Sequence, residues 1–143
     1  MKNLNWRDVP RSFVLCDQSS CPMASCCLRQ MAMQVAGRRD RFLTIVNPHR
    51  TAPSAQCAYY RDATPVAYGR GFLHMQSQML PAQYREFSYS LRRQFGRNAY
   101  YERRSGRHLC SPSEVACVRR RLASLGLSHL DFDAYEERYN WDD

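Results

Sequence analysis

Apolar residues recur at helical spacing in the first third of the chain, beside a proline suited to the first turn of a helix. The pattern predicts a helix that begins at Ser20 or Cys21, just before Pro22, and ends at Gly37. The residues on its apolar face are Ala24, Cys27, Leu28, Met31 and Val35. The phase of this helix therefore points Cys27 toward the interior and its neighbour Cys26 away from it.

Two short apolar runs after this helix predict β-strands. FLTIV, residues 42–46, is rich in β-branched side chains and short enough for a buried strand, and CAYYR, residues 57–61, predicts a second one. Residues 47–81 are relatively rich in proline and glycine. We expect this stretch to link an N-terminal and a C-terminal part of the protein.

The C-terminal half carries two strong helix signals. The first helix is predicted to start at Pro81 and to stop before Gly96, which suits the C-terminal cap. Its apolar face consists of Tyr84, Phe87, Leu91 and Phe95. The second starts at SPSE, residues 111–114, where Ser111 and Glu114 form a capping box, and is predicted to end at Gly126. Its apolar side consists of Val115, Val118, Leu122 and Leu125.

Two further elements complete this half. AYYERRSGRHLC, residues 99–110, predicts a β-hairpin with Ser105 and Gly106 at its turn. Asp131 is predicted to cap a last helix, whose inner residues are Phe132, Tyr135 and Tyr139.

These elements predict a small α+β fold: a cysteine-rich helix with short strands, followed by helix, hairpin, helix and helix. We expect a single domain over residues 1–143, in which residues 63–80 connect the subregions 1–62 and 81–143.

Composition and charge narrow the class of protein. The chain has 44% hydrophobic residues and a formal net charge of +8, with 20 arginines and a single lysine. Residues 85–121 hold ten arginines and three glutamates, whereas the acidic end of the chain, 122–143, can fold back and neutralise part of this charge. No apolar run suits a signal peptide or a membrane span. We therefore expect a cytoplasmic protein with reduced thiols and no membrane contact.

Four of the seven cysteines lie within residues 16–27. An odd number of cysteines in a reducing compartment makes disulfides the least favoured interpretation. Four thiolates from two chain segments suit a metal, and we predict Cys16, Cys21, Cys27 (or Cys26) and Cys57 as its ligands. Zinc is the metal we favour; a [4Fe–4S] cluster is the alternative, because the spacing lacks CxxC pairs. Plain buried thiols and reactive thiols are the other interpretations.

A resemblance supports this choice of ligands. FVLCDQSSCPMASCCLR, the later VNP with CAYYR, and the C-terminal FGRNAYYERRSGRHLCSPSEV and FDAYEERYNW are together similar to an uncharacterised bacterial family of unknown function. The resemblance implies that the cysteines matching Cys16, Cys21, Cys27 and Cys57 recur in the family, whereas those at the other positions are additions. It implies no activity.

The basic block interleaves arginines with aromatic residues, a composition typical of nucleic-acid surfaces. We predict phosphate contacts from Arg103, Arg104 and Arg107 at the hairpin and from Arg119, Arg120 and Arg121 on the next helix. The alternative is a solvated surface on which these arginines pair with Glu102, Glu136 and Glu137.

No spacing of histidines or glycines selects an active site, and we predict no catalytic residue. The sequence therefore favours a binding module that a four-cysteine metal site stabilises, with nucleic acid as its first candidate partner. The alternative function is that of an iron–sulfur or thiol-based redox or metal sensor.

Overall fold

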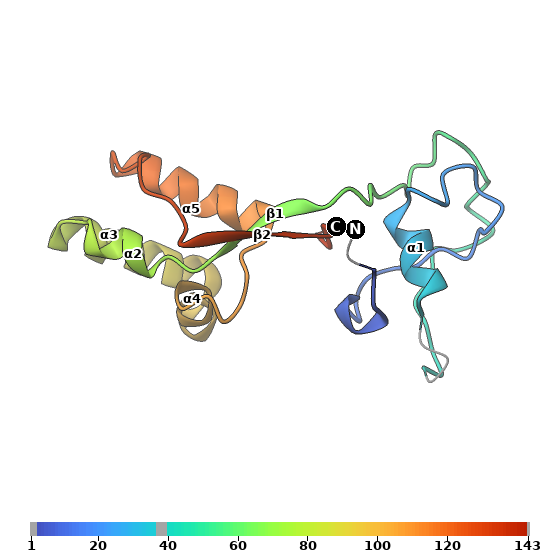
Figure 1. Ribbon diagram of the computed structural model, residues 1–143, viewed down its shortest axis with the longest axis horizontal. Helices are drawn as coiled ribbons and strands as arrows, with labels where there is room; N and C mark the ends of the chain where they lie inside the picture. The colour runs from blue at the N-terminus through green and yellow to red at the C-terminus, as the bar shows by residue number, and fades with distance from the viewer. Residues whose placement is uncertain (1–2, 37–39, 143) are drawn as a thin grey trace. The chain divides into compact units, whose positions relative to one another are not determined.

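The computed structural model describes residues 3–36 and 40–142 and confirms a small α+β protein (Figure 1). Along the chain the elements are the 3-10 helix η1 (Trp6–Asp8), α1 (Leu28–Gln34), β1 (Val66–Arg70), α2 (Leu73–Ser77), α3 (Pro81–Phe95), α4 (Arg97–Arg104), α5 (Pro112–Ser124) and β2 (Ala134–Arg138). The two strands pair antiparallel, from Val66 opposite Arg138 to Arg70 opposite Ala134.

The chain folds into two compact units. Of the described residues, the N-terminal unit holds 3–36, 40–64 and 139–141, and the helical unit holds 65–138 with Asp142. The N-terminal unit contains α1 and all the cysteines up to Cys57, and the helical unit contains the sheet and the helices α2 to α5. The single-domain organisation stays a prediction.

The helical unit is built around a buried cluster of apolar side chains from α2 to α5 and from the segments that follow β1, precede α5 and precede β2. The cluster consists of Phe72, Met75, Phe87, Leu91, Tyr100, Cys110, Val115, Val118, Leu122, Leu127, Leu130 and Phe132. Phe72 lies at its centre, with its ring centroid 5.9 Å from that of Phe87, 5.7 Å from that of Tyr100 and 6.1 Å from that of Phe132. This core holds α3 against α5.

The two strong helix predictions are confirmed. α3 begins with Pro81 and ends before Gly96, whose φ of 89° lies in the region that favours glycine. α5 begins with the predicted capping box, in which the Ser111 hydroxyl accepts from the Glu114 amide and the Glu114 carboxylate accepts from the Ser111 amide. Both helices are encoded by local signals at their ends.

The predicted hairpin over residues 99–110 is wrong, because α4 occupies Arg97–Arg104. Gly96 lets the chain leave α3 and start a second helix at once, and Tyr100 of α4 is buried beneath Phe72. The turn at Ser105 and Gly106 therefore ends a helix instead of joining two strands.

The predicted last helix is also wrong, because residues 134–138 form β2. Its partner β1 lies in a stretch that carried no clear pattern, so the pairing was invisible from local sequence. Arg70 of β1 donates from Nε at 3.1 Å and from Nη2 at 2.6 Å to Glu136 of β2, which also pairs with Arg138. Phe132 is buried as predicted, whereas Tyr135 is exposed.

The N-terminal unit has little regular structure. Its core consists of Val9, Phe13, Leu15, Leu28 and Ala32, with Trp141 edge-on to Phe13 at 4.8 Å between ring centroids. The helix predicted to start near Pro22 begins only at Leu28, and its predicted end at Gly37 lies outside the described residues. The reason is tertiary: Cys27 is extended and bridges to Asp62, while the Leu28 amide donates to the Arg61 carbonyl and the Ala63 amide to the Cys26 carbonyl.

The two predicted strands of this unit are wrong as well. Residues 42–46 contribute a single parallel bridge, Leu15 to Ile45, and Phe42 is 92% exposed. Residues 57–61 form a turn followed by extended chain, with one bridge nearby between Cys27 and Asp62. Without an extended partner along their length, β-branched residues alone do not make a strand.

Candidate functional site

Arg29 holds three segments of the N-terminal unit together. Its side chain is buried, and its guanidinium donates to the carbonyl of Val14 at 2.8 Å and to that of Tyr59 at 2.9 Å. The Cys16 amide in turn donates to the carbonyl of Arg29 at 3.3 Å, and the guanidinium lies 5.2 Å from the ring centroid of Phe13. Because each of these three segments carries a cysteine nearby, Arg29 brings the cysteines toward one region.

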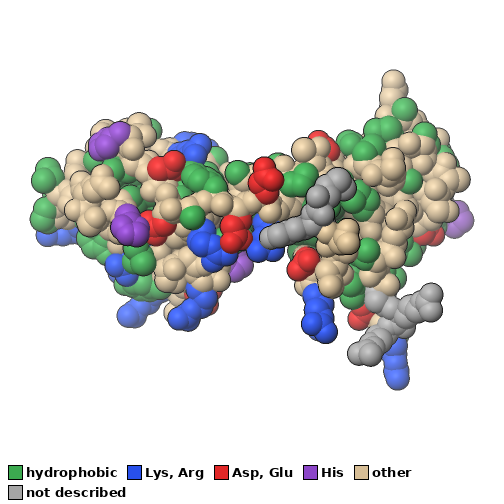
Figure 2. Space-filling model, in the orientation of Figure 1, with side chains coloured by type: hydrophobic (Ala, Val, Ile, Leu, Met, Phe, Trp, Pro, Cys, Tyr) green, Lys and Arg blue, Asp and Glu red, His purple; other side chains and the backbone are tan. Residues whose placement is uncertain are grey.

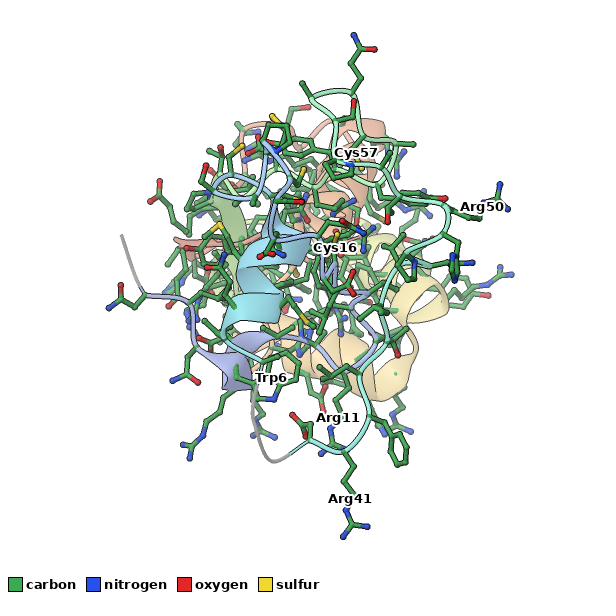
Figure 3. The ribbon with its side chains drawn as sticks, turned by 90° about the vertical axis from the view of Figure 1, so that its right-hand side faces the viewer. Trp6, Arg11, Cys16, Arg41, Arg50 and Cys57 are labelled. Atoms are coloured by element: carbon green, nitrogen blue, oxygen red, sulfur yellow. The ribbon has the colours of Figure 1, made fainter. Side chains whose placement is uncertain are left out.

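The segments that carry three of the four predicted ligands are joined by hydrogen bonds. The Cys16 amide donates to the Arg29 carbonyl, two residues after Cys27, and Nε of Arg29 donates to the Tyr59 carbonyl, two residues after Cys57. Burial raises the pKa of the Cys16 thiol. Figure 3 shows Cys16 and Cys57 on the same side of the N-terminal unit, away from Trp6 and Arg11.

The two adjacent cysteines differ as the sequence predicted. Cys27 is buried and caps the start of α1, whereas Cys26 is half-buried and its thiol donates to the Met23 carbonyl at 3.4 Å. A hydrogen bond with Cys26 raises the pKa of Tyr60 to about 12. Because α1 begins at Leu28, the N-terminal end of the helix lies beside Cys27 and not beside Cys21.

Cys21 lies in a series of tight turns, in which its amide donates to the Gln18 carbonyl and its carbonyl accepts from the Ala24 amide. All seven cysteines are free thiols. Across residues 3–36 and 40–142, no group of three or more Cys, His, Asp or Glu side chains is arranged to hold a metal ion. The fold thus joins the segments that carry Cys16, Cys27 and Cys57, and the described residues form no ligand cage.

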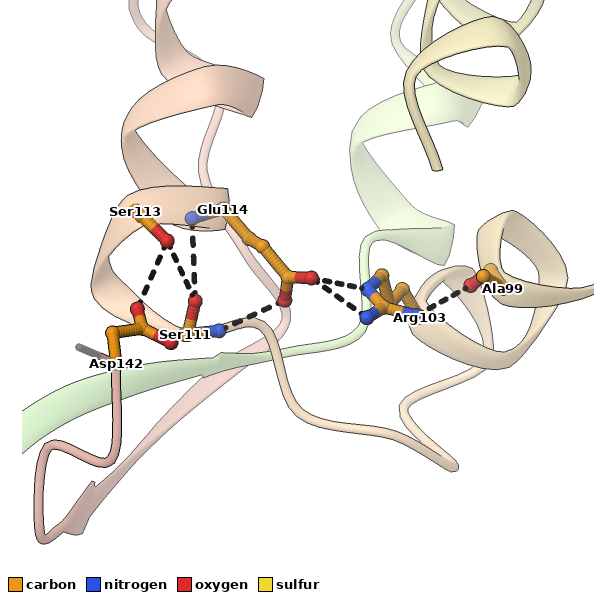
Figure 4. A network of polar contacts seen from close by, with 6 residues as sticks. All are labelled: Ala99, Arg103, Ser111, Ser113, Glu114 and Asp142. Atoms are coloured by element: carbon orange, nitrogen blue, oxygen red, sulfur yellow. Dashed lines mark hydrogen bonds and ion pairs between the residues drawn. The ribbon is translucent and has the colours of Figure 1, made fainter. Parts of the chain in front are cut away.

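Two of the arginines predicted to contact phosphates are engaged inside the helical unit. Arg103 donates to one oxygen of Glu114 at 2.6 Å and 3.0 Å and to the carbonyl of Ala99 at 3.2 Å (Figure 4). Its side chain is only 14% exposed. Arg104 donates to Gln76 at 2.6 Å. These contacts tie α4 to the start of α5 and to α2.

The remaining predicted arginines lie on the surface in different settings. Arg107 is exposed after α4. Arg119 donates to the hydroxyl of Tyr135 at 2.6 Å and pairs with Asp131 at 3.7 Å. The anticipated partners Glu102, Glu136 and Glu137 are not the ones these arginines take among the described ion pairs. Figure 2 shows arginines spread over the helical unit with acidic side chains between them, so the charge forms no single patch on this face.

Arg120 and Arg121 meet Arg93 in a groove between α3 and α5. The groove has a volume of about 590 Å³. Its lining residues are Tyr89, Ser90, Leu91, Arg93, Gln94, Cys117, Arg120, Arg121 and Ser124, and none of them is acidic. Arg93 lies over the ring of Tyr89 at 5.8 Å, and Nε of Arg121 donates to the Ser90 hydroxyl.

Arg93 and Tyr89 at this groove, and the structural role of Arg29, were not predicted from the sequence. The i to i+4 spacing of Tyr89 and Arg93 on the predicted helix was an available signal. Nothing local marks Arg29, because its partners are carbonyls from distant turns.

A helical unit with a basic groove and a cysteine-bearing unit clamped by a buried arginine define a small two-unit α+β protein. The chain belongs to a family of unknown function, DUF6078, which matches residues 1–141. The predicted membership of a family without an assigned function is thereby confirmed. No curated protein and no solved structure matches the chain. In the part of the chain that the structure describes, no helix is both long and apolar enough to cross a membrane.

Proposed function

We propose that the chain is a small cytoplasmic binding protein whose N-terminal unit is stabilised by a metal ion held by Cys16, Cys21, Cys27 and Cys57. The observation that supports this is that Arg29 joins three segments of the N-terminal unit, each of which carries a predicted ligand. A region with so little helix and strand gains most from a bound metal, because metal-binding energy then contributes directly to folding.

The donor set suits zinc. Thiolates bind Zn²⁺ at about 2.3 Å in a tetrahedron, and structural zinc sites are usually closed by four protein ligands. Four thiolates also hold a [4Fe–4S] cluster, the basis of the alternative function as a redox or metal sensor. Cys26 is the wrong neighbour for either group, because its thiol is turned to the Met23 carbonyl.

Metal binding would require a local rearrangement. Cys21 must approach the other three thiols, and it lies among short turns such as Cys21 to Gln18 and Ala24 to Cys21. Turns of this kind, outside any helix or strand ladder, can adjust with the loss of few hydrogen bonds. Folding of residues 17–26 around the metal is therefore part of the proposal.

The experiment is anaerobic purification of the full chain followed by measurement of colour, zinc, iron and sulfide. We expect a colourless protein with about one zinc per chain. A brown protein with iron and sulfide would overturn the zinc assignment in favour of the cluster. A folded protein without metal, which also takes up none when zinc is added, would overturn the site.

Two adjacent cysteines provide the matched control. Cys27→Ser is expected to abolish zinc retention and to lower the stability of the N-terminal unit, whereas Cys26→Ser, one residue away, keeps the metal. If the two variants retain equal amounts of zinc, the ligand assignment is wrong. Far-ultraviolet circular dichroism of each full-length variant distinguishes loss of metal from global unfolding. The signal comes mainly from α3, α4 and α5, which belong to the helical unit.

We propose nucleic acid as the partner of the helical unit. This is supported by the net charge of +8 and by the groove between α3 and α5, which gathers three arginines without a carboxylate. Binding through phosphates releases counterions, so the affinity for nucleic acid is expected to fall steeply as salt rises. No detectable binding of the full chain to DNA or RNA at low salt would end this part of the proposal.

A further inference from the structure

The groove between α3 and α5 has the chemistry of a nucleotide-binding surface. The guanidinium groups of Arg93 and Arg120 make no ion pair with the described carboxylates, and Arg121 uses only its Nε, on Ser90. Arg93 and Arg120 are exposed and Arg121 is half-buried. Three guanidiniums without a carboxylate form a local excess of positive charge that an anion can neutralise.

Four other arginines of the helical unit, Arg70, Arg103, Arg119 and Arg138, each pair with a carboxylate within the unit. Arg97 and Arg107 are exposed and, like the groove arginines, make no ion pair among the described residues, but neither lines the groove. What distinguishes the groove is that three arginines without a carboxylate line the same hollow.

The groove also holds an aromatic ring beside the charge. Tyr89 is 56% exposed, although an aromatic side chain of this size is usually more deeply buried. Arg93, one turn later on α3, lies over its ring at 5.8 Å and orients it. An exposed ring next to arginines is the arrangement on which unpaired bases stack while their phosphates are neutralised.

We propose that this groove binds single-stranded nucleic acid, with phosphates at Arg93, Arg120 and Arg121 and a base stacked on Tyr89. The inference rests on the proposed nucleic-acid-binding function. It places the binding site in the groove between α3 and α5 and not at Arg103, Arg104 and Arg107, the arginines of the predicted hairpin. A duplex is the less suitable ligand, because its bases are already stacked and do not reach a side chain such as Tyr89. Gln94 and Ser124 at the rim supply neutral hydrogen-bonding groups for bases or sugars.

The test is fluorescence anisotropy of the full chain with labelled oligo(dT) and with a duplex of equal length. Binding to the single strand is expected to be tighter, with a slope of log affinity against log salt of about −2 for three phosphates. Arg93→Ala and Arg120→Ala are each expected to reduce the steepness of that slope by about 0.7. Arg97→Ala, which removes the same charge from an exposed position outside the groove, leaves the slope unchanged.

The aromatic contact has its own matched pair of variants. Tyr89→Ala is expected to weaken oligo(dT) binding by about tenfold, the loss of one stacked base, whereas Tyr89→Phe keeps the ring and the affinity. As an independent readout, bound oligo(dT) is expected to slow alkylation of Cys117, which lines the groove, and not that of Cys26. This second measurement needs no variant and therefore does not depend on the folding of one.

The outcomes separate the site from the function. If the chain binds neither oligo(dT) nor duplex at low salt, both the function and the groove assignment fail. If it binds and the groove variants match Arg97→Ala, nucleic-acid binding stands and the groove assignment fails. Tighter binding of the duplex than of oligo(dT) overturns the choice of single-stranded nucleic acid as the occupant. The same choice is overturned if polyglutamate, an anionic polymer without bases, displaces labelled oligo(dT) as effectively as unlabelled oligo(dT) does.

Discussion

Arg103→Ala tests whether this arginine stabilises the helical unit or is available on the surface to contact phosphates. The wild-type side chain makes two hydrogen bonds to Oε1 of Glu114, at 2.6 Å and 3.0 Å, and one to the Ala99 carbonyl at 3.2 Å. Its guanidinium also lies 5.2 Å from the ring centroid of Phe95. The substitution removes all of these contacts and leaves the carboxylate of Glu114, whose side chain is 22% exposed, without its cation.

The expected loss in the free energy of unfolding is about 3 kcal/mol. Removal of one partner from a buried ion pair costs about 3–5 kcal/mol, because the remaining charge keeps its desolvation penalty. The Arg103 and Glu114 side chains are 14% and 22% exposed, so water reaches the remaining carboxylate and the lower end of that range applies. Glu114 also accepts from the Ser111 amide at 3.1 Å, and that cap bond persists in the variant and limits the loss.

The assay is equilibrium unfolding in urea, followed by far-ultraviolet circular dichroism. Most helical residues belong to α3, α4 and α5, so the signal reports on the helical unit. The urea concentration at the midpoint is expected to fall, while the slope of the unfolding free energy against urea stays unchanged. This combination indicates lost stability without a change in the surface that unfolding exposes. Arg97→Ala, at the exposed start of α4, is the control and is expected to change stability by less than about 0.5 kcal/mol.

A double-mutant cycle with Glu114→Ala isolates the pair. The coupling energy between the two positions is expected to be about 2 kcal/mol, because the second substitution removes a carboxylate that has already lost its partner. The reasoning is refuted if Arg103→Ala unfolds within about 0.5 kcal/mol of the wild type, or if the two substitutions are additive. Arg103 would then be available to a ligand, as the sequence had predicted.

Two further predictions concern the sheet region. In Gly69→Ala the new Cβ would lie 2.6 Å from Cδ1 of Phe132, so the free energy of unfolding is expected to fall by about 1–3 kcal/mol. In a double-mutant cycle measured by urea unfolding, Phe132→Leu should reduce the cost of Gly69→Ala. If the effects of the two substitutions simply add, the clash is contradicted. Asp133→Ala should cost about 1 kcal/mol at neutral pH, because its carboxylate accepts from the Leu73 amide at 3.0 Å and the His74 amide at 3.1 Å. Burial raises the pKa of Asp133, but these bonds outweigh it and the pKa lies below its ordinary value of 3.8. The stabilisation is therefore complete above that value and is lost as the pH falls through the folded pKa, so the difference between wild type and Asp133→Ala should shrink in acid; a difference that grows would refute the assignment.

The positions of the cysteines could be predicted from the sequence only in part. Helix phase separated Cys27 from Cys26, and the structure buries Cys27 and leaves Cys26 half-buried. The reason for the separation is different from the predicted one, because Cys27 lies before α1, in extended conformation, and bridges to Asp62. The segments that carry Cys16, Cys27 and Cys57 are joined through Arg29, whose carbonyl partners are 15 and 30 residues away in the chain.

The sequence alone determined the elements whose signals lie within one helix: α3 from Pro81 to its glycine cap, α5 from its capping box, and the apolar faces that pack them. Local signals suffice there because hydrogen bonds and caps connect residues three or four positions apart. Only the tertiary structure decided that residues 134–138 form a strand with Val66–Arg70, and that Arg103 is internal while Arg120 lines a groove. Strand pairing and ion pairing join residues far apart in the chain, so which of two equally basic side chains finds a carboxylate depends on what the fold places beside it.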